Sequence, residues 1–543
     1  MKNFSVLCGK LEGVSCIHKL PAGFRRSSCR DLVRSLFQVL FFFNPFILEL
    51  IYFIMLSLLG YLALRFTTPN TRTSFRSKDF DFFFTSVSST TVSSMATVEM
   101  EFFSNAQLII MTILMSLGGE VFTSMLQLQL AKSKIPKFHD TNHIVDVEVN
   151  STKRSFDRIE LGLATPSQLE SEQKQNIHNA MKSLNIDSTT IKYNSIRYLA
   201  YVVLGYLLVV HIVGSSLISS YITLVPSARQ VLKNKGIEIQ TFSVFTTVST
   251  FSNCGFVPTN ENMIVFRSNS GLLLLLIPQI LLGNTLYPVT LRFIIWVLEK
   301  ITRRVEFRYM LKNYKELGYS HLLSGLHSVL LLVTVSGFIL VQVILFCAME
   351  WKSEAMDGLS GYQKFVASVF QTVNSRHAGE SVFDLSIISP AILTLFVLMM
   401  YLPPYTRFDP AVCECEDGDA SENVKIRNPR KILMESLIFS QLSYIAIFVI
   451  LICITERQKM MEDPLNLNVL NIVIEVVSAY GNVGFSTGYS CKRRLNSDGD
   501  CKDAWYGLAG RFSTEGKFIL ILVMFFGRLK KYSLKQGKAW KLS

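Results

Sequence analysis

Asn482-Val483-Gly484-Phe485 lies between two apolar segments near the end of the chain. Three other tetrapeptides lie between apolar segments in the same way earlier in the sequence. These are Val92-Ser93-Ser94-Met95, Asn253-Cys254-Gly255-Phe256 and His377-Ala378-Gly379-Glu380. We call the four tetrapeptides the first to fourth corners, in chain order. Small residues are needed where backbone carbonyls must turn inward to replace the water shell of an ion. The repetition therefore predicts a pore that one polypeptide builds from four similar units.

Composition places the chain in a membrane. Of its 543 residues, 49% are hydrophobic and 17% are charged, whereas a soluble protein carries about 25% charged residues. The formal net charge of +13 is accounted for by Lys and Arg in cytoplasmic loops. We find no basic segment with a motif that reads RNA or DNA, so nucleic acid is not an expected partner. The sequence predicts an all-α membrane protein, with the lipid bilayer as its surroundings.

Eight apolar segments are long enough, or nearly so, for the roughly 20 residues that cross a bilayer as a helix. They are Leu36–Leu64, Leu108–Leu130, Leu199–Thr223, Gly271–Leu298, Leu322–Cys347, Leu385–Leu402, Ile432–Ile454 and Gly516–Leu529. Within each successive pair, a shorter apolar segment leads to a corner: Asp79–Ser93, Glu238–Asn253, Gly361–Asn374 and Leu465–Tyr480. We expect these to be re-entrant pore helices. Non-helical backbone at membrane depth is tolerated only where it lines a water-filled cavity, so the corners indicate a hydrated pore.

The pattern divides the chain into four pseudo-symmetric helix–pore-helix–helix units around one pore, with eight transmembrane helices. The units are A (36–131), B (196–299), C (321–403) and D (432–530); the cytoplasmic loops are 132–195, 300–320 and 404–431, and the cytoplasmic tails are 1–35 and 531–543. The loops and tails together carry most of the Lys and Arg, which puts both termini in the cytoplasm and the corners outside. The loop at 132–195 lacks apolar periodicity over much of its length, so we expect a flexible segment.

The candidate selectivity filter consists of Ser94, Gly255, Gly379 and Gly484, flanked by Ser93, Asn253, Cys254, Ala378, Asn482 and Val483. Each pore helix ends just before its corner, and the free carbonyls at a helix C-terminus favour a cation. Backbone oxygens suit a hard monovalent cation, Na⁺ or K⁺, whereas a divalent-cation pore more often has a ring of acidic side chains. Ser94 brings a Cβ and a hydroxyl where the other corners have Gly. This change either favours Na⁺ over K⁺ or is tolerated without effect.

Outside the corners, few residues indicate chemistry. Arg528 in the last span is either a barrier to cations below the filter or a side chain that reaches the inner interface. Cys491 and Cys501 share one polar loop, which permits a disulfide if that loop is extracellular. The histidines show no ligand spacing, and no P-loop is present. We therefore expect no enzyme activity, no cofactor and no metal other than Na⁺ at the filter.

These motifs resemble the plant high-affinity potassium transporter (HKT) family, within the superfamily of Trk and Ktr potassium-uptake proteins. The resemblance runs from about residue 36 to the C-terminus. Its most specific segments are Thr91-Val-Ser-Ser-Met-Ala-Thr-Val-Glu-Met-Glu101, Leu117-Gly-Gly-Glu-Val-Phe122, Ser252-Asn-Cys-Gly-Phe256, Asn374-Ser-Arg-His-Ala-Gly-Glu380, Ala479-Tyr-Gly-Asn-Val-Gly-Phe485 and Gly527-Arg-Leu-Lys530. The family is often dimeric, so the resemblance implies a homodimer. It also implies that the filter is Ser94, Gly255, Gly379 and Gly484 and that Arg528 takes part in the permeation barrier.

Members with one Ser and three Gly in the filter resemble Na⁺-selective uniporters, whereas all-Gly members also carry K⁺. The resemblance therefore implies a plasma-membrane Na⁺ uniporter with a role in Na⁺ homeostasis and salt tolerance. The alternatives that stay open are Na⁺/K⁺ cotransport or K⁺ uptake, a carrier for another solute, and a membrane protein that transports nothing. A carrier typically presents helix N-termini to its site, while these corners follow helix C-termini.

Overall fold

The computed structural model describes residues 45–69, 79–134, 166–403, 405, 441–493 and 505–533. Regular structure in these residues is helical. The chain divides into two units, residues 1–51 and 52–543. The described residues of the first unit are the start of α3 (Pro45–Phe66), which continues into the second unit. The corners and the helices around them belong to the second unit. The predicted tail at 1–35, and most of the loop at 404–431 and of the tail at 531–543, lie outside the described residues.

Four short helices lead to the four corners, as the sequence predicts. They are α4 (Asp79–Thr90), α10 (Ile239–Ser252), α15 (Gly361–His377) and α20 (Val469–Gly481). Local chemistry fixes their limits. Ser360 begins α15 with a capping box, and the side chain of Asn468 accepts a hydrogen bond from Asn471 at the start of α20. Asn253 and Asn482 end their helices with φ of 58° and 53°, the left-handed conformation that Asn tolerates better than most residues.

Other helices flank the pore helices on both sides. They are α5 (Asn105–Gly118), α6 (Glu120–Lys134), α8 (Pro166–Leu224), α11 (Ser270–Gly283), α12 (Tyr287–Thr302), α14 (Gly325–Glu350), α16 (Pro390–Tyr401), α18 (Gln441–Thr455) and α21 (Thr514–Ser533). The shorter elements are α9 (Pro226–Lys235), α13 (Val305–Lys312), α19 (Arg457–Glu462) and the 3-10 turns Met100–Phe102, Asn262–Phe266, Glu354–Met356, Cys491–Arg493 and Leu508–Arg511.

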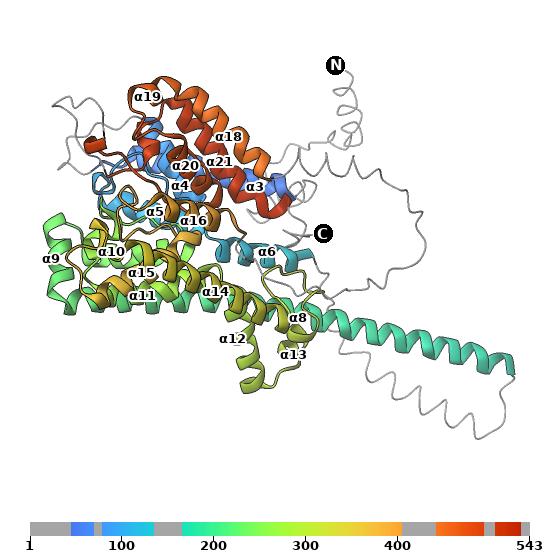
Figure 1. Cartoon of the computed structure of the whole chain (residues 1–543). Helices are drawn as coiled ribbons and strands as arrows, with labels where there is room; N and C mark the ends of the chain where they lie inside the picture. Colours follow the sequence, from blue (N-terminus) through green and yellow to red (C-terminus); the bar gives the residue numbers. More distant parts are fainter. Residues whose placement is uncertain are drawn as a thin grey trace, which may run out of the picture. The chain divides into compact units, whose positions relative to one another are not determined.

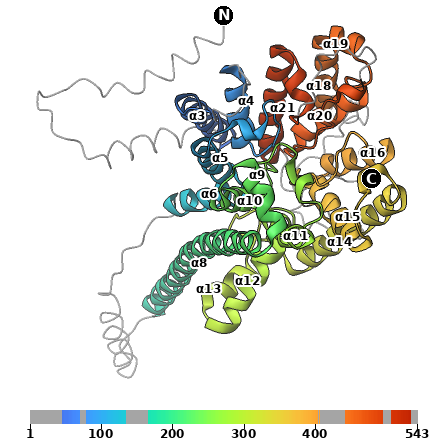
Figure 2. The same ribbon diagram turned by 90° about the vertical axis from the view of Figure 1, so that its left-hand side faces the viewer.

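The helices that follow the corners close the second unit into a cycle. Each packs on its own pore helix: α5 on α4, α11 on α10, α16 on α15 and α21 on α20. Each also packs on the next pore helix along the chain: α5 on α10, α11 on α15, α16 on α20 and α21 on α4. Figures 1 and 2 show these blue, green, orange and red groups beside one another. The cycle brings the four corners to one place.

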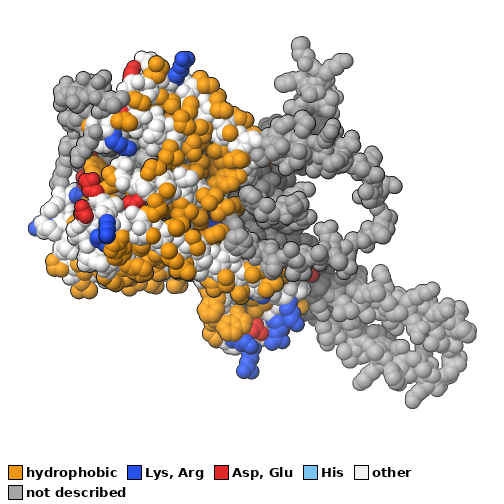
Figure 3. Space-filling view, viewed as in Figure 1, with side chains coloured by type: hydrophobic (Ala, Val, Ile, Leu, Met, Phe, Trp, Pro, Cys, Tyr) orange, Lys and Arg blue, Asp and Glu red, His pale blue; other side chains and the backbone are white. Residues whose placement is uncertain are grey.

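Among the described residues, three helices are long and apolar enough to cross a membrane, or up to five if each of two bent pairs counts as one span. The three candidate spans are Phe46–Phe66 of α3, Thr190–Leu224 of α8 and Gly325–Glu350 of α14. Apolar side chains of α14 face outward, Val333 with 63% and Leu340 with 60% exposed, and Figure 3 shows hydrophobic side chains over much of this face. Such exposure suits contact with lipid. The count of eight spans remains a prediction.

Two spans that we expected to be single helices are broken. α5 and α6 meet at Gly119 with a bend of 55°, and α11 and α12 meet with a bend of 83°. Two successive glycines, Gly118 and Gly119, lower helix propensity at the first break. At the second, Pro288 lies in the first turn of α12, where its missing N–H costs no intrahelical bond. Each of the predicted spans 108–130 and 271–298 therefore consists of two helices joined at a bend.

The expectation of a flexible loop over 132–195 is wrong for its second half. Helix α8 begins at Pro166 and continues unbroken into the span that ends at Leu224. Pro suits the first helical position, and residues 167–195 contain neither Gly nor Pro. Good helix formers such as Leu, Glu, Gln, Lys and Met recur there, so propensity carries the helix without an apolar stripe. Residues 135–165 lie outside the described chain.

Candidate functional site

Every corner holds its small residue in the left-handed region of the backbone map. The φ angles are 51° at Ser94, 94° at Gly255, 75° at Gly379 and 99° at Gly484. Gly adopts such angles without steric cost, whereas a residue with a Cβ is strained by about 1–2 kcal/mol. The first corner therefore accepts strain at Ser94 that the other three avoid.

The corners touch one another in chain order around a ring. A Cβ on Gly255 would lie 1.9 Å from the carbonyl oxygen of Ala378, and one on Gly379 would lie 1.8 Å from that of Val483. A Cβ on Gly484 would lie 2.3 Å from the Cβ of Ser94. The thiol of Cys254 lies against the backbone of Ser94 and completes the ring. Gly is thus required at three junctions because neighbouring backbone or Ser94 fills the space.

Hydrogen bonds from the flanking asparagines hold two corners in place. The Asn253 amide donates to the carbonyls of Phe251 and of Ile280, at 3.1 and 3.3 Å. The Asn482 amide donates to the carbonyl of Met524, at 3.2 Å, and to the hydroxyl of Ser93, at 2.7 Å. The second asparagine thereby connects the fourth corner with the first. The predicted flanking residues do lie together with the predicted filter residues.

Two serines, one on the second and one on the fourth pore helix, hold their corners and were not predicted from the sequence. Ser249 Oγ accepts a hydrogen bond from the Gly255 N–H at 3.2 Å. Ser478 Oγ accepts one from the Gly484 N–H at 2.9 Å. In each pair the Ser precedes the Gly by six positions, and Ser88 precedes Ser94 by the same number. That spacing is the signal by which the sequence alone reveals these residues.

The first corner does not use its pore-helix serine in this way. Ser88 Oγ is buried and has no hydrogen-bond partner in the described part of the chain. Its carbonyl does accept from the Ser93 N–H, at 2.8 Å. The hydroxyl of Ser93 lies 2.8 Å from that of Thr91 and receives the Asn482 amide. The first corner is consequently held by backbone bonds to its own pore helix and by one side-chain bond from the fourth corner.

The third corner is one residue shorter. Its pore helix continues to His377, and the N–H groups of Gly379 and Glu380 donate to the backbone and side-chain oxygens of Asn374, at 3.2 and 3.1 Å. Glu380 is fully buried, and its carboxylate accepts a hydrogen bond from Thr250 on the neighbouring pore helix. The Glu380 side chain is therefore buried between the third corner and the second pore helix and does not belong to an exposed ring of acidic residues.

Arg528 lies beside the break between α5 and α6. Its Nη2 donates to the carbonyl of Gly118, the last residue of α5, and its guanidinium is 5.4 Å from the ring centre of Phe53. The preceding Gly527 packs closely on the fourth pore helix, since a Cβ there would lie 2.1 Å from the carbonyl of Tyr480. Arg528 thus sits just past the end of a pore helix, bound to the negative end of another helix.

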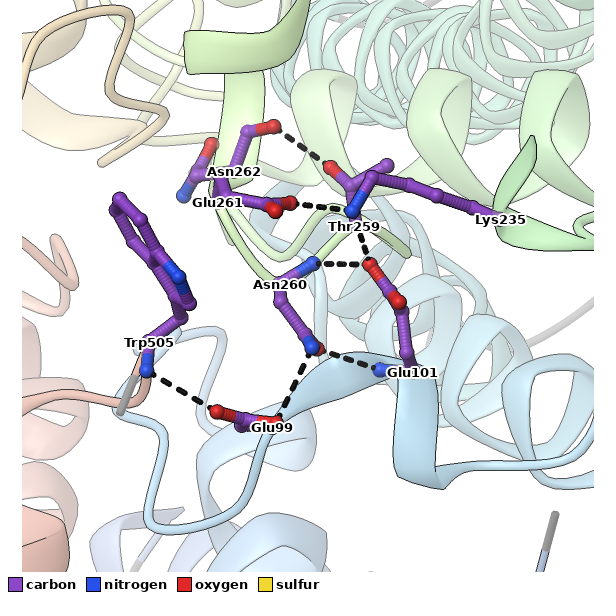
Figure 4. Close-up of polar contacts among 8 residues, drawn as sticks. All are labelled: Glu99, Glu101, Lys235, Thr259, Asn260, Glu261, Asn262 and Trp505. Atoms are coloured by element: carbon purple, nitrogen blue, oxygen red, sulfur yellow. Dashed lines mark hydrogen bonds and ion pairs between the residues drawn. The ribbon is translucent and has the colours of Figure 1, made fainter. Parts of the chain in front are cut away.

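Beyond the corners, a polar cluster joins loops of units A, B and D (Figure 4). Lys235 Nζ lies 2.5 Å from a carboxylate oxygen of Glu101 and 2.5 Å from one of Glu261. Asn260 donates through its backbone to Glu101, at 3.1 Å, and through its amide to Glu99, at 3.2 Å. Glu99 also accepts from the backbone of Trp505, at 3.3 Å. The cluster connects the segments that leave the first and second corners.

Lys235 follows the C-terminus of α8 by eleven positions and lies outside the apolar helices. Burial alone would lower the pKa of its ammonium group. Hydrogen bonds to Glu101 and Glu261, together with their negative charges, outweigh burial and raise the pKa above its ordinary value. Lys235 is therefore a permanent positive charge at this cluster.

The cysteine and metal predictions are only partly covered by the described residues. Cys491 forms a disulfide, but Cys501 lies outside those residues, so their pairing remains a prediction. Cys254 is a free, buried thiol. Where the structure is described, no group of three or more His, Cys, Asp or Glu side chains could hold a metal ion.

Known proteins resemble this chain over most of its length. A family model named TrkH, described as cation transport protein, matches residues 181–406 and 413–536. "Sodium transporter HKT1" of Arabidopsis thaliana is 54% identical over 489 residues, 88% of this chain and 92% of the relative. "Cation transporter HKT1;3" of Oryza sativa subsp. japonica is 50% identical over 528 residues, 96% of each chain. Among solved structures, the potassium transporter TrkH from Vibrio parahaemolyticus aligns with a TM-score of 0.48 and 13% identity, over 90% of this chain and 83% of that one.

Proposed function

The chain belongs to the HKT transporters within the TrkH family of cation transport proteins, and on that premise we propose that it is a passive, sodium-selective uniporter. It is a multi-pass membrane protein and a transporter, not an enzyme. The observation that carries the proposal is the ring of four touching corners with a serine at one position and glycine at three.

The cation passes through this ring. Four pore helices end directly before the corners, so the partial negative charges of their C-termini converge on the ion. Ser94, Gly255, Gly379 and Gly484 form the filter, and Ser93, Asn253, Cys254, Ala378, Asn482 and Val483 support it. The buried Glu380 leaves the ring without exposed carboxylates of its own, which favours a monovalent ion coordinated by carbonyl oxygens.

Ser94 selects Na⁺ over K⁺. Its Cβ occupies space beside Gly484 that an all-glycine ring would leave open. The Ser94 side chain narrows the filter on one of its four sides and adds a hydroxyl oxygen. Both changes disfavour the larger K⁺. The Arabidopsis relative is named a sodium transporter, which agrees with this assignment.

Arg528 forms a constriction on the cytoplasmic side of the filter. Its positive charge is held near the fourth pore helix by the Gly118 carbonyl, so a cation that has left the ring must pass close to it. A fixed positive charge is a barrier to cation flow. We propose a location in the plasma membrane with both termini in the cytoplasm, and assembly as a homodimer.

Flux into liposomes tests the uniport proposal. Purified protein is reconstituted into vesicles without ATP, and Na⁺ entry is followed with a sodium-sensitive dye while a negative interior potential is imposed. Uniport predicts Na⁺ entry that follows the potential and needs no K⁺ on either side. Entry that requires external K⁺ would instead support Na⁺/K⁺ cotransport, and K⁺ entry without Na⁺ would support K⁺ uptake.

A further inference from the structure

The α12–α13 hairpin lies across the direction of the spans. Helix α12 turns 83° from α11, and Figure 1 shows it crossing the direction of α11 and α14 before α13 returns. At this angle α12 does not continue along the axis of α11. If α11 crosses the bilayer, α12 lies close to the plane of its surface.

Helix α12 has one face on the protein and another facing outward. Tyr287, Leu291 and Ile295 are fully buried and belong to a core that includes Phe307 of α13. On the outward face, Phe293 is 59% and Trp296 48% exposed, and their rings stack with centres 5.9 Å apart. Two large exposed aromatic residues side by side are typical of the membrane–water interface.

Basic side chains continue this outward face. Exposed Lys and Arg follow the aromatic pair along α12, the turn and α13: Lys300, Arg303, Arg304, Arg308, Lys312 and Lys315. Figure 3 shows blue Lys and Arg side chains along the edge of the hydrophobic lobe at the bottom of the view. Arg308 pairs with Glu299 at 3.3 Å, and Arg304 lies 5.2 Å from the ring centre of Tyr198. In the described chain, no carboxylate forms an ion pair with Lys300, Arg303, Lys312 or Lys315.

We propose that the α12–α13 hairpin binds the phosphate headgroups of anionic phospholipids in the cytoplasmic leaflet. Phe293 and Trp296 enter the headgroup–acyl boundary, and Lys300, Lys312 and their neighbours contact the phosphates. This inference goes beyond transport but uses the orientation proposed above. Charge complementarity favours this occupant, because basic residues close to an anionic membrane surface are attracted to it. A second copy of the same basic face would repel the first.

Quenching of Trp296 by brominated lipids tests the proposal. The full-length protein with Trp296 as its sole tryptophan (Trp351→Phe, Trp505→Phe, Trp540→Phe) is placed in nanodiscs that mix phosphatidylglycerol with phosphatidylcholine. Bromine is carried on the acyl chains of one lipid or the other at the same total composition. We expect at least twofold stronger quenching per molecule from the anionic lipid.

Two matched variants make the result specific. Lys300→Gln/Lys312→Gln should bring the two quenching efficiencies together. The control Lys233→Gln/Lys352→Gln removes the same charge from exposed lysines elsewhere and should keep the difference. Equal quenching by both lipids in the parent, no quenching at all, or a preference that survives the Lys300/Lys312 change would overturn the proposal. Na⁺ flux by these proteins is measured separately, so a failure of the lipid site is distinguished from a failure of the transport proposal.

Discussion

The first and fourth corners resemble each other in backbone but differ in what holds them. Both have a left-handed residue at the end of the pore helix, Val92 and Asn482, and another two positions later. In the fourth corner, the pore-helix Ser478 accepts the Gly484 N–H. In the first, Ser88 is unpaired within the described chain, and the hydroxyl of Ser93 receives the Asn482 amide from the fourth corner.

This difference shows how a ring of four unequal corners accommodates one serine. The Cβ of Ser94 fits because Gly484 has none, and a Cβ at both positions would place the two atoms 2.3 Å apart. Ser94 and the adjacent Gly484 therefore depend on each other. A filter can hold a side chain at one corner only if the neighbouring corner has a glycine there.

The largest expected effect comes from adding a Cβ to a glycine that faces backbone. Gly379→Ala would put this atom 1.8 Å from the carbonyl of Val483, on a residue with φ of 75°. Strain of about 3 kcal/mol should reduce Na⁺ current by about a hundredfold. The control is Gly337→Ala, where a Cβ meets nothing within 4 Å. Currents are compared at equal surface abundance, and a normal current from Gly379→Ala would show that the ring is packed differently.

A double substitution sharpens the comparison between the first and fourth corners. Gly484→Ala alone should impair transport, because its Cβ meets that of Ser94. Combining it with Ser94→Gly removes that contact, though the carbonyl of Ser93 remains 2.8 Å away. We expect recovery of about tenfold, a coupling of about 1.4 kcal/mol. Ser94→Gly should not rescue Gly379→Ala, whose clash is with Val483. Equal rescue of both alanine variants would contradict the pairing.

Sequence predicts the corners well because their requirements are local. Gly255, Gly379 and Gly484 stand out by residue type and by their place after short apolar segments. The breaks at Gly119 and before Pro288 were missed because the hydropathy of the two halves is continuous across each break. The order of contacts around the ring, and the bond from Asn482 to Ser93, join residues far apart in the chain. No local pattern contains that information.

Loss of a pore-helix serine should have a moderate effect that differs between corners. Ser478→Ala leaves the Gly484 N–H without its acceptor, which costs about 1–3 kcal/mol when such a group is buried. Ser88→Ala removes a hydroxyl that has no partner among the described residues, so its effect should stay within about 0.5 kcal/mol. Thermal unfolding of the purified protein in detergent checks this. Equal losses from the two substitutions would show that the first corner also uses its serine.

The smallest expected effect concerns the outer cluster at Lys235, whose pKa is raised in the folded protein. A raised pKa contributes stability that is fully present below the unfolded value of about 10.4 and is lost as pH rises through the folded value. Lys235→Met should therefore lower stability by about 1 kcal/mol or less at neutral pH, and the difference from wild type should shrink only at strongly alkaline pH. Lys233→Met is the exposed control. A difference that already vanishes near neutral pH would contradict the assignment.

The most direct test of the Na⁺-selective ring is the reversal potential of the wild type and of Ser94→Gly, measured by voltage clamp with external Na⁺ and K⁺ varied separately. We predict that the wild-type reversal potential follows Na⁺ alone, and that Ser94→Gly adds a response to K⁺ because the first corner then lacks the serine Cβ and hydroxyl. A wild-type potential that follows K⁺ as closely as Na⁺, or a Ser94→Gly protein with unchanged selectivity, would contradict the role given to this serine.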